Sequence, residues 1–402
     1  MDCVFSNVKV LDFSSTAAGP LSTAILADMG AEVYKVERPL VGDDIRGYSP
    51  RIDGQSQLFM WYNRGKKSVT IDLHDPEGQE ILRKMIPSID VVVESFRPGT
   101  MKKFGLDYET LHALNPALVY CSISGYGQTG PYAKKPGYDL LAQAVSGIMD
   151  MTGDPDGMPT KSGFTLGDYV GGINAYGAIV TALYYAKNTG KGQWIDISLV
   201  EGLTFMNSFL DIVGCFGKDP HRMGRHQNSL APFGLFMGKN GQSAVICAPS
   251  DKLWKALCTV MDRPDGLTNP RINTTVSRVE NLADTVAFIE NWLRGFDNID
   301  EAIEKMEAAG IPCGKVKSTR EVASDPQFIS RNGLIDLPTP NSMTTRKSIR
   351  VRGPWIKYSE TPMVMKRPPD LGEHNHEVLE SFGIDPDKID SLMRRWENGS
   401  AR

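Results

Sequence analysis

The chain has 402 residues, 41% hydrophobic and 23% charged, and its 44 basic residues stand against 48 acidic ones for a formal net charge of −4. This composition is typical of a soluble globular protein, and the length exceeds the roughly 250–300 residues that one core supports, so we expect at least two domains. The small excess of acidic residues argues against a general nucleic-acid-binding protein, so we expect no nucleic-acid partner. A local basic cluster could still hold a polyanionic small molecule.

The longest apolar stretch, residues 171–186, is shorter than the ~20 residues that cross a bilayer and includes Asn174, so we expect a buried helix and no membrane partner. The first residues, MDCVFSNVKVLDF, lack the basic start and apolar centre of a secretory signal. The six cysteines show no CxxC and no zinc spacing. We therefore predict reduced thiols, a cytoplasmic location and no bound metal.

Strand and helix patterns alternate through the first half of the chain. Asp75, Pro76 and Glu77 supply an N-cap, a first-turn proline and a first-turn acid for one of the helices. Predicted strands lie at 8–13, 32–37, 68–73, 91–93 and 117–124, with helices after 19 and after 75. Alternation of this kind predicts a parallel sheet covered on both faces, in a Rossmann-like α/β domain.

The pattern changes after the strand-like residues 194–197. One long apolar helix is expected over 200–213, followed by a loop rich in Gly, Pro and Asn at 224–234. Residues 225–325 read as a smaller α+β domain. The following 330–365 are extended and punctuated by proline, and a helical pattern returns near the C-terminus.

The sequence GYGQTG at 125–130 is a literal G-x-G-x-x-G after a strand. A dinucleotide fingerprint needs a helix that starts at the third glycine, but Pro131 follows at once and the next helical pattern begins near Asp139. We therefore interpret the glycines as a turn that lets the backbone approach a ligand or another segment.

Local basicity is a second candidate feature. Residues 34–67 hold seven cations and four acids in an otherwise acidic chain, and Arg97, Lys102, Lys103, Lys134 and Lys135 follow at the ends of later strands. Ligands of open α/β sheets bind beyond the carboxyl ends of the strands, so these loops are candidates for a phosphate-bearing ligand. Plain solvated surface charge is the alternative.

Asp168 lies among glycines in GFTLGDYVGG, just before an apolar helix. Such an acid is either the N-cap of that helix, which would then begin at Tyr169, or a reactive group that the glycines leave open to a ligand. None of the six histidines lies in a triad or metal-site context, and no G-x-S-x-G elbow is present. The chemistry is therefore expected to need no imidazole.

Several motifs together resemble the class III coenzyme A transferases, which include formyl-CoA, crotonobetainyl/carnitine and aryl-lactate CoA transferases and are related in fold to α-methylacyl-CoA racemases. They occur in order along the chain: VLDFSSTAAGPLSTAILADMGAEVYKVERP, VVVESFRPGTMKKFGLDYETL, SISGYGQTGP, PGYDLLAQAVSG, GDYVGG, TGKGQWIDISLVEG and DLGEHNHEVLESFGI.

The resemblance implies an interlocked homodimer in which each chain has a large and a smaller domain joined by two linkers. On this basis we assign residues 1–200 to a large Rossmann-like CoA-binding domain, 201–224 to a linker helix and loop, and 225–325 to a small α+β domain. A return linker would occupy 326–365, and 366–402 would pack back on the large domain.

The resemblance also matches Asp168 to the nucleophilic aspartate of the family. A carboxylate with an ordinary pKa near ~3.9 is ionised at neutral pH and needs no general base. It would move CoA from an acyl-CoA to a small carboxylic acid through aspartyl anhydride and aspartyl-CoA thioester intermediates. Acyl-CoA is then a substrate, and no permanently bound cofactor is expected.

Further residues carry over position by position. For the CoA nucleotide they are Arg38, Ile71, Asp72, Leu73, His74, Ser95, Phe96, Arg97 and Lys103; for the reacting groups they are Thr16, Ala17, Ala18, Tyr138 and Asp139. Tyr48, with Trp61 and Tyr62, is a candidate for shaping the acceptor pocket, with ordinary core packing as the alternative.

Two departures from the family limit the substrate assignment. Ala17 replaces the glutamine of formyl-CoA transferases, and their polyglycine loop is absent, with 224–234 in its place. The racemases carry P-G-H-D where this chain has Pro136-Gly137-Tyr138-Asp139, and tyrosine is a poor base for proton exchange. A transferase is therefore favoured, with a racemase or a non-catalytic CoA-binding homologue as alternatives.

Overall fold

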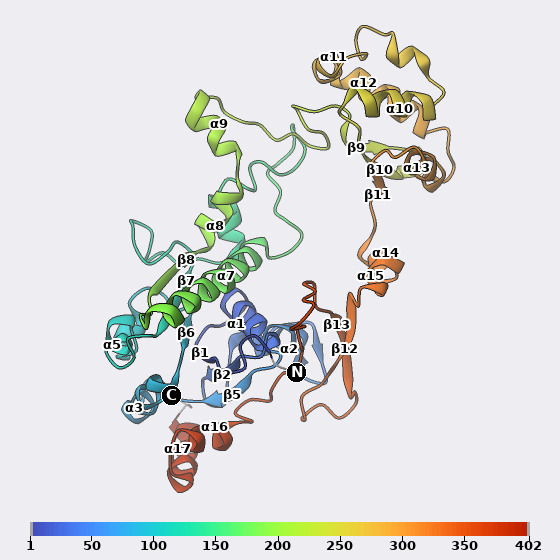
Figure 1. Cartoon of the computed structure of the whole chain (residues 1–402). Helices are drawn as coiled ribbons and strands as arrows, with labels where there is room; N and C mark the ends of the chain where they lie inside the picture. The colour runs from blue at the N-terminus through green and yellow to red at the C-terminus, as the bar shows by residue number, and fades with distance from the viewer. Residues whose placement is uncertain (1–2, 400–402) are drawn as a thin grey trace. The chain divides into compact units, whose positions relative to one another are not determined.

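The structure is a computed structural model that describes residues 3–399, and its chain forms two compact units (Figure 1). The larger unit comprises Met1–Ile148, Ser162–Ser208 and Pro326–Arg402, and the smaller one Met149–Lys161 and Phe209–Asp325. The ends of the predicted terminal segments, 1–2 and 400–402, lie outside the described residues.

A six-stranded sheet organises the larger unit. Its strands are β1 (Lys9–Asp12), β2 (Glu32–Glu37), β5 (Lys67–Thr70), β6 (Val91–Glu94), β7 (Val119–Ser124) and β8 (Trp194–Ser198). They run in the order β5-β2-β1-β6-β7-β8, and every neighbouring pair is parallel. This confirms the predicted α/β class with a parallel central sheet. The strand order reverses between β1 and β6, which creates a topological switch point.

Strands β1, β2, β5, β6 and β7 are buried on both faces, whereas β8 is only partly buried. Successive side chains of a strand point to opposite faces, so each buried strand contributes to two cores. Val10 of β1 belongs to the core that includes α1 (Ala18–Asp28), α2 (Gln57–Tyr62) and α7 (Leu166–Thr189). Leu11 belongs to the opposite core, with α3 (Pro76–Met85), α16 (Asn375–Ser381) and α17 (Pro386–Gly399).

Capping residues and side-chain contacts determine where several of these helices begin. Asp75 caps α3 by accepting a hydrogen bond from the Glu77 N–H, and Pro76 occupies the first turn, as the sequence predicts. His374 and Asn375 at the start of α16 cover the edge of β5: Asn375 Oδ1 accepts from the Thr70 N–H at 2.8 Å, and the His374 N–H donates to the Ser68 carbonyl at 3.0 Å.

Shorter elements complete the larger unit. They are β3 (Arg51–Ile52), β4 (Gln55–Ser56), α4 (Thr100–Lys103), α5 (Tyr108–His112), α6 (Asp139–Val145), α8 (Leu199–Met206), α15 (Pro326–Ser330), β12 (Leu334–Pro338) and β13 (Ser348–Arg352). Strands β12 and β13 form an antiparallel hairpin whose inward residues, Leu337, Ile349 and Val351, join the core with α1 and α7.

The smaller unit contains an antiparallel three-stranded sheet with its own core. Its strands, in the order β11-β10-β9, are β9 (Phe233–Met237), β10 (Ser243–Cys247) and β11 (Cys313–Lys315). Its helices are α9 (Phe209–Phe216), α10 (Asp251–Val260), α11 (Thr275–Glu280), α12 (Leu282–Leu293), α13 (Ile299–Ala308) and α14 (Thr319–Ala323). Trp254, Phe236 and Ile289 are buried in this core.

The expectation of one long helix over 200–213 is wrong. The chain forms α8 and α9 with a break at Asn207 and Ser208, where the Asn207 side chain donates to the Ser146 carbonyl at 3.3 Å. Within residues 3–399, no single helix has the length and apolarity to span a membrane, and only the broken pair α8 and α9 matches by length and composition.

Candidate functional site

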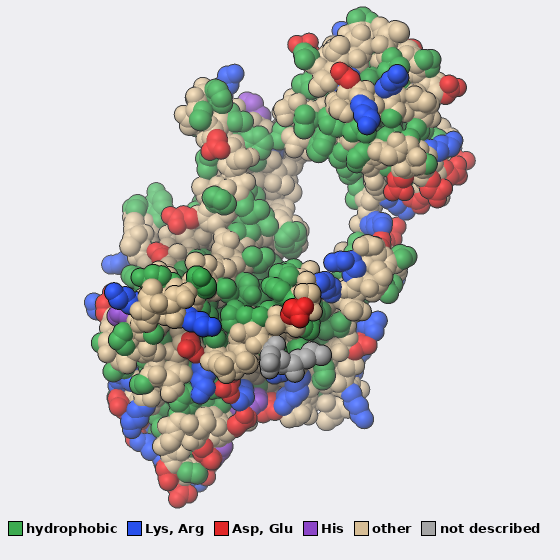
Figure 2. Space-filling view, viewed as in Figure 1, with side chains coloured by type: hydrophobic (Ala, Val, Ile, Leu, Met, Phe, Trp, Pro, Cys, Tyr) green, Lys and Arg blue, Asp and Glu red, His purple; other side chains and the backbone are tan. Residues whose placement is uncertain are grey.

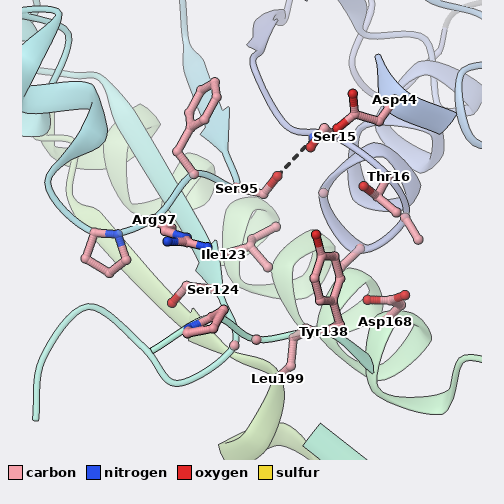
Figure 3. Close-up of a pocket in the computed structure, with 18 of the residues that line it drawn as sticks. Ser15, Thr16, Asp44, Ser95, Arg97, Ile123, Ser124, Tyr138, Asp168 and Leu199 are labelled. Carbon is pink, nitrogen blue, oxygen red and sulfur yellow. Dashed lines mark hydrogen bonds between the residues drawn. The ribbon is translucent and has the colours of Figure 1, made fainter. Parts of the chain in front are cut away.

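A pocket opens at the carboxyl ends of β1, β6 and β7, which is the switch point of the sheet (Figure 3). The starts of α1 and α7 also border it. The pocket holds about 960 Å³ with its open mouth included. Its lining residues are Ser15–Gly19, Asp44, Tyr48, Ser95–Pro98, Ile123–Gly125, Ala133, Lys135–Tyr138, Asp168 and Leu199. Open α/β sheets bind ligands at this position because several strand ends deliver loops to one crevice.

Asp168 lies in the first turn of α7, where Figure 3 shows its carboxylate beside the Tyr138 ring. The alternative that Asp168 is an N-cap is wrong, because Thr165 precedes the helix and the capping carboxylate belongs to Asp139. Asp139 Oδ1 accepts from the backbone N–H groups of Gly167 at 2.6 Å and Asp168 at 3.3 Å. The Asp168 side chain is thus free for another role.

The assumption of an ordinary pKa for Asp168 is also wrong. Burial, and to a smaller extent the charge of Asp139, raise its pKa from 3.8 to about 7. Near neutral pH the carboxyl group is therefore divided between its two protonation states. A group that titrates at working pH in a pocket is typical of a functional site.

The loop after β1 carries three of the predicted residues into the pocket: Thr16, Ala17 and Ala18. Thr16 has a φ of 72°, a left-handed conformation that is strained for a β-branched residue. Asp43 holds it there by accepting the Thr16 N–H at 3.1 Å, and Asp43 in turn pairs with buried Lys35 at 2.9 Å.

A second buried ion pair supports the same loop. Asp12, at the end of β1, accepts from the Ser14 N–H at 2.9 Å and from Lys66 Nζ at 2.8 Å. Burial acts to raise the pKa of Asp12, but the positive charges of Lys66 and Lys35 outweigh it and lower the pKa to about 2. Two ion pairs therefore fix the conformation of one pocket wall.

The loop after β6 forms the opposite wall and presents Ser95, Phe96 and Arg97. Buried Glu94 accepts from the Phe96 N–H at 2.8 Å, and Ser95 Oγ accepts from the Ser15 N–H at 2.9 Å, which joins the two loops (Figure 3). Burial raises the pKa of Glu94 to about 7.

The structure brings nine of the predicted residues together around this pocket: Thr16, Ala17, Ala18, Tyr48, Ser95, Phe96, Arg97, Tyr138 and Asp168. Asp139 accepts hydrogen bonds from the backbone N–H groups of Gly167 and Asp168, as described above. Trp61 and Tyr62, the two aromatic residues that were considered with Tyr48, are both buried in the core.

The remaining predicted residues do not line the pocket. Ile71, Asp72, Leu73 and His74 follow β5, and the His74 ring packs edge-on against Phe104, the neighbour of Lys103, with ring centroids 5.3 Å apart. Arg38, at the end of β2, donates to Asp44, which is itself a lining residue.

The interpretation of residues 34–67 as a basic cluster for a ligand is wrong for most of its cations. Lys35, Arg46, Arg64 and Lys66 are buried or nearly so and pair with Asp43, Glu37, Asp28 and Asp12, respectively. Their charges are neutralised inside the protein, so they stabilise the fold instead of offering a phosphate site.

The pocket walls depend on Lys35, Lys66, Asp43 and Asp12; the sequence placed the first three in the basic segment 34–67 without predicting that they form buried ion pairs, and Asp12 was not among the candidates. One signal for them was available. Lys35 interrupts the otherwise buried strand EVYKVE, and a charge within a buried strand requires a partner. No group of His, Cys, Asp and Glu side chains within residues 3–399 is arranged to hold a metal ion.

The glycines of 125–130 serve backbone packing. A side chain at Gly125 would collide with the Cα of Gly137 at 2.7 Å, while Gly127 and Gly130 have positive φ. The following helix, α6, begins only at Asp139. The chain at Gly125 and Gly137 thus reaches the pocket wall by close backbone contact, in line with the interpretation as a turn.

Comparisons with known proteins identify relatives over nearly the whole chain. Residues 5–375 match the family model described as CoA-transferase family III. The succinyl-CoA–D-citramalate CoA-transferase of Chloroflexus aurantiacus is 35% identical over 393 residues, covering 97% of this chain and 96% of that protein. The human succinyl-CoA:glutarate CoA-transferase is 34% identical over 375 residues, covering 92% and 84%.

A similar solved structure agrees with this relationship. A CAIB/BAIF family protein from Brucella suis has a TM-score of 0.83 and 33% identity, and the match covers 95% of this chain and 100% of that one. The relatives named here are transferases, which favours the transferase over the racemase alternative. The chain belongs to CoA-transferase family III and is a CoA-transferase, as predicted from its motifs.

Proposed function

We propose that Asp168 is the nucleophile that carries CoA from an acyl-CoA donor to a small carboxylic acid. The observation that carries this proposal is the position of Asp168 in the pocket at the switch point, in the first turn of α7, with its pKa raised to about 7. A partly desolvated carboxylate needs no imidazole partner to attack a thioester.

In the first step an Asp168 carboxylate oxygen attacks the thioester carbonyl carbon, the C–S bond breaks, and CoA thiolate leaves an acyl-aspartyl anhydride. The thiolate then attacks the aspartyl carbonyl carbon, which releases the donor acid and forms an aspartyl-CoA thioester. The acceptor carboxylate displaces CoA to form a second anhydride, and the thiolate attacks the acceptor acyl carbon. This last step releases the new acyl-CoA and restores the Asp168 carboxylate.

The loop 16–18 is suited to stabilise the oxyanion in each of these steps. The first turn of α1 begins at Ala18, and N–H groups at a helix start have no partner within the helix. Ala17 offers no side-chain amide, so the backbone N–H groups of Ala17 and Ala18 would carry this role. The two buried ion pairs behind the loop keep these groups in position.

The nucleotide part of CoA would extend from the pocket past Arg97 towards Lys103, His74 and the residues 71–73. Arg97 lines the pocket, and the His74 ring packs against Phe104, the neighbour of Lys103 in the chain. Arg38 is paired with Asp44 and would contribute to phosphate binding only after this pair opens.

The acceptor acid is proposed from the relatives. The names of the similar transferases from Chloroflexus aurantiacus and humans include succinyl, citramalate and glutarate groups, and that of a 40% identical protein from Acetobacter aceti includes oxalate. All of these acids carry two carboxylates. We therefore propose a dicarboxylic acid for at least one of the two substrates.

The test is trapping of the acyl-enzyme. Incubation with succinyl-CoA or acetyl-CoA and hydroxylamine should convert Asp168 to a hydroxamate, detected by peptide mass spectrometry, and should inactivate the enzyme. The D168A variant should lose exchange by at least about 10³-fold. The exposed Asp156 provides the control variant D156N, which should retain activity. Normal turnover by D168A would contradict the mechanism.

We also propose that the protein is a cytoplasmic homodimer with interlocked chains. Large apolar side chains of the larger unit are exposed on α7 and α8: Ile173 at 50%, Tyr184 at 74% and Phe205 at 91%. Figure 2 shows hydrophobic side chains on the surface around these helices. A second copy of the chain would cover these side chains, because contiguous exposed apolar surface on a soluble protein often marks an interaction site.

A further inference from the structure

Strand β13 presents Arg350 and Arg352 on the same exposed side, but within residues 3–399 only Arg350 forms an ion pair. Arg350 forms a two-point ion pair with Asp336 across the hairpin, with distances of 2.9 and 2.7 Å. Arg352 faces Leu334 in the hairpin register and has no carboxylate within ion-pair distance in the described part of the chain. Its positive charge is therefore available to a ligand.

Aromatic side chains hold Arg352 in place. Its guanidinium lies 4.0 Å from the centre of the Trp61 ring, and its Nη1 donates to the Tyr169 hydroxyl at 2.5 Å. A guanidinium has five N–H groups in a planar fork, so one bond to Tyr169 leaves several donors. Stacking on an aromatic face orients the fork without neutralising it.

The Arg352 contacts lead back to the proposed nucleophile. Tyr169 follows Asp168 on α7, and the Tyr62 hydroxyl interacts with both Tyr169 and Thr165 at the start of that helix. Thr165 lies three positions before Asp168 and four before Tyr169, so it neighbours both residues, whereas the consecutive Asp168 and Tyr169 point in different directions. The charge of Asp168 also acts on Tyr62, which shows that these groups are close.

A buried donor lies in the same place. Trp61 is 3% exposed, and its indole Nε1 has no hydrogen-bond partner among the described residues. A buried donor without a partner is rare in a folded protein and calls for an explanation, such as a ligand or water that accepts from it. The Arg352 guanidinium is the group here that binds a carboxylate, and the indole N–H of the neighbouring Trp61 is a donor that the described residues leave unused.

We propose that Arg352 binds the second carboxylate of a dicarboxylic substrate while the first carboxyl group reacts at Asp168. The proposal rests on the proposed function and deepens it by naming the residue that selects the substrate class. The carboxyl carbons of succinyl and glutaryl groups are roughly 4–5 Å apart, given C–C bonds of ~1.5 Å. The second carboxylate would thus lie about this far from the carbon that reacts at Asp168, towards Tyr169 and Arg352.

The experiment compares the R352Q and R352K variants with wild type on acids matched in length: succinate against butyrate, and glutarate against pentanoate, with acetyl-CoA as donor. Exchange of labelled CoA into acetyl-CoA, which needs no acceptor acid, is measured in parallel. The control variant is R350Q, which removes an exposed arginine of the same strand whose charge is already paired. Thermal unfolding of every variant reports on folding.

For R352Q we expect kcat/KM for succinate and glutarate to fall about 10- to 100-fold, the usual effect of losing a charged hydrogen bond, through a higher KM. Butyrate, pentanoate and labelled-CoA exchange should change by less than about threefold. R352K should restore part of the dicarboxylate activity, since it keeps the charge but loses the fork. R350Q should resemble wild type.

Three results would overturn the inference: equal loss of all activities in R352Q, unchanged dicarboxylate activity in R352Q, or a wild type that prefers the monocarboxylic acids. Equal loss with a lowered unfolding temperature would show that Arg352 only clamps β13 to α2. Failure of the proposed function looks different, because wild type itself would then show no exchange of labelled CoA into acetyl-CoA.

Discussion

At the scale of single residues, Asp168 combines reactivity with a cost to stability. A carboxyl group whose pKa is raised in the folded protein favours folding only while it is protonated. Its favourable contribution is complete below the unfolded pKa near 3.8 and is lost as the pH rises through the folded pKa of about 7. The folded protein is therefore less stable when Asp168 is ionised, which is the form that acts as the proposed nucleophile.

The D168N variant should consequently be more stable than wild type, by an amount that grows between pH 4 and 7 and is constant above pH 7. Each pKa unit corresponds to ~1.4 kcal/mol, so the full gain in the free energy of unfolding should be about 2–4 kcal/mol. Urea unfolding at pH 4, 6 and 8 measures it. A gain that is equal at all three values would show that the pKa of Asp168 is not raised.

Buried and exposed ion pairs should differ sharply in their contribution to stability. K35M leaves the buried Asp43 carboxylate without its partner and should lower the free energy of unfolding by about 3–5 kcal/mol. R38M breaks the exposed pair with Asp44 and should change it by less than about 1 kcal/mol. Urea unfolding at neutral pH compares the two, and equal effects would contradict the structural role given to Lys35.

At the scale of elements, the start of α7 links capping to reactivity. Asp139 caps the helix, and its charge contributes to the raised pKa of Asp168. D139N keeps an oxygen acceptor but removes the charge. We expect the pH midpoint of kcat/KM to move to lower pH than in wild type, because Asp168 then ionises more easily.

The same variant should lose only about 0.5–1 kcal/mol of stability, since a neutral cap still bonds the N–H groups but interacts less favourably with the helix dipole. D154N, which changes an exposed aspartate of the smaller unit, is the control and should leave the pH profile unchanged. An unchanged or raised midpoint in D139N would show that the Asp139 charge does not act on Asp168.

At the scale of the whole molecule, the larger unit is assembled from three separate chain segments: Met1–Ile148, Ser162–Ser208 and Pro326–Arg402. Helices α16 and α17 pack in the core beneath β5 although more than three hundred residues separate them from it. In the proposed interlocked dimer, two chains with this connectivity could separate only if one of them unfolded.

Subunit exchange tests this proposal. Two dimer preparations that differ in an affinity tag are mixed at neutral pH, and mixed dimers are detected by native mass spectrometry. We expect none over a day, and a statistical mixture after joint unfolding in urea and refolding. Mixed dimers that form readily without denaturant would indicate an ordinary interface, and a chain that stays monomeric would exclude the dimer.

Much of the fold could be predicted from local sequence. The strands 32–37 and 117–124, the capped helix after Asp75 and the C-terminal helices all follow from hydrophobic periodicity and capping residues, which are local properties. The break between α8 and α9 could not, because both halves are apolar and it depends on an Asn207 contact with Ser146. Nine of the proposed site residues meet at one pocket because the loops that follow parallel strands share one edge of the sheet.

The sequence by itself determined the α/β class, the family and the candidate Asp168, because these depend on short motifs and on the order of strands and helices. Only the tertiary structure decided which charged side chains are exposed and which are neutralised by a buried partner. Lys35 and Lys66, which count as free cations in the sequence, are neutralised by Asp43 and Asp12. The raised pKa of Asp168 and the contacts of Arg352 with Trp61 and Tyr169 also depend on the tertiary structure. Burial and residues distant in the sequence create these environments, and the neighbouring residues in the sequence do not reveal them.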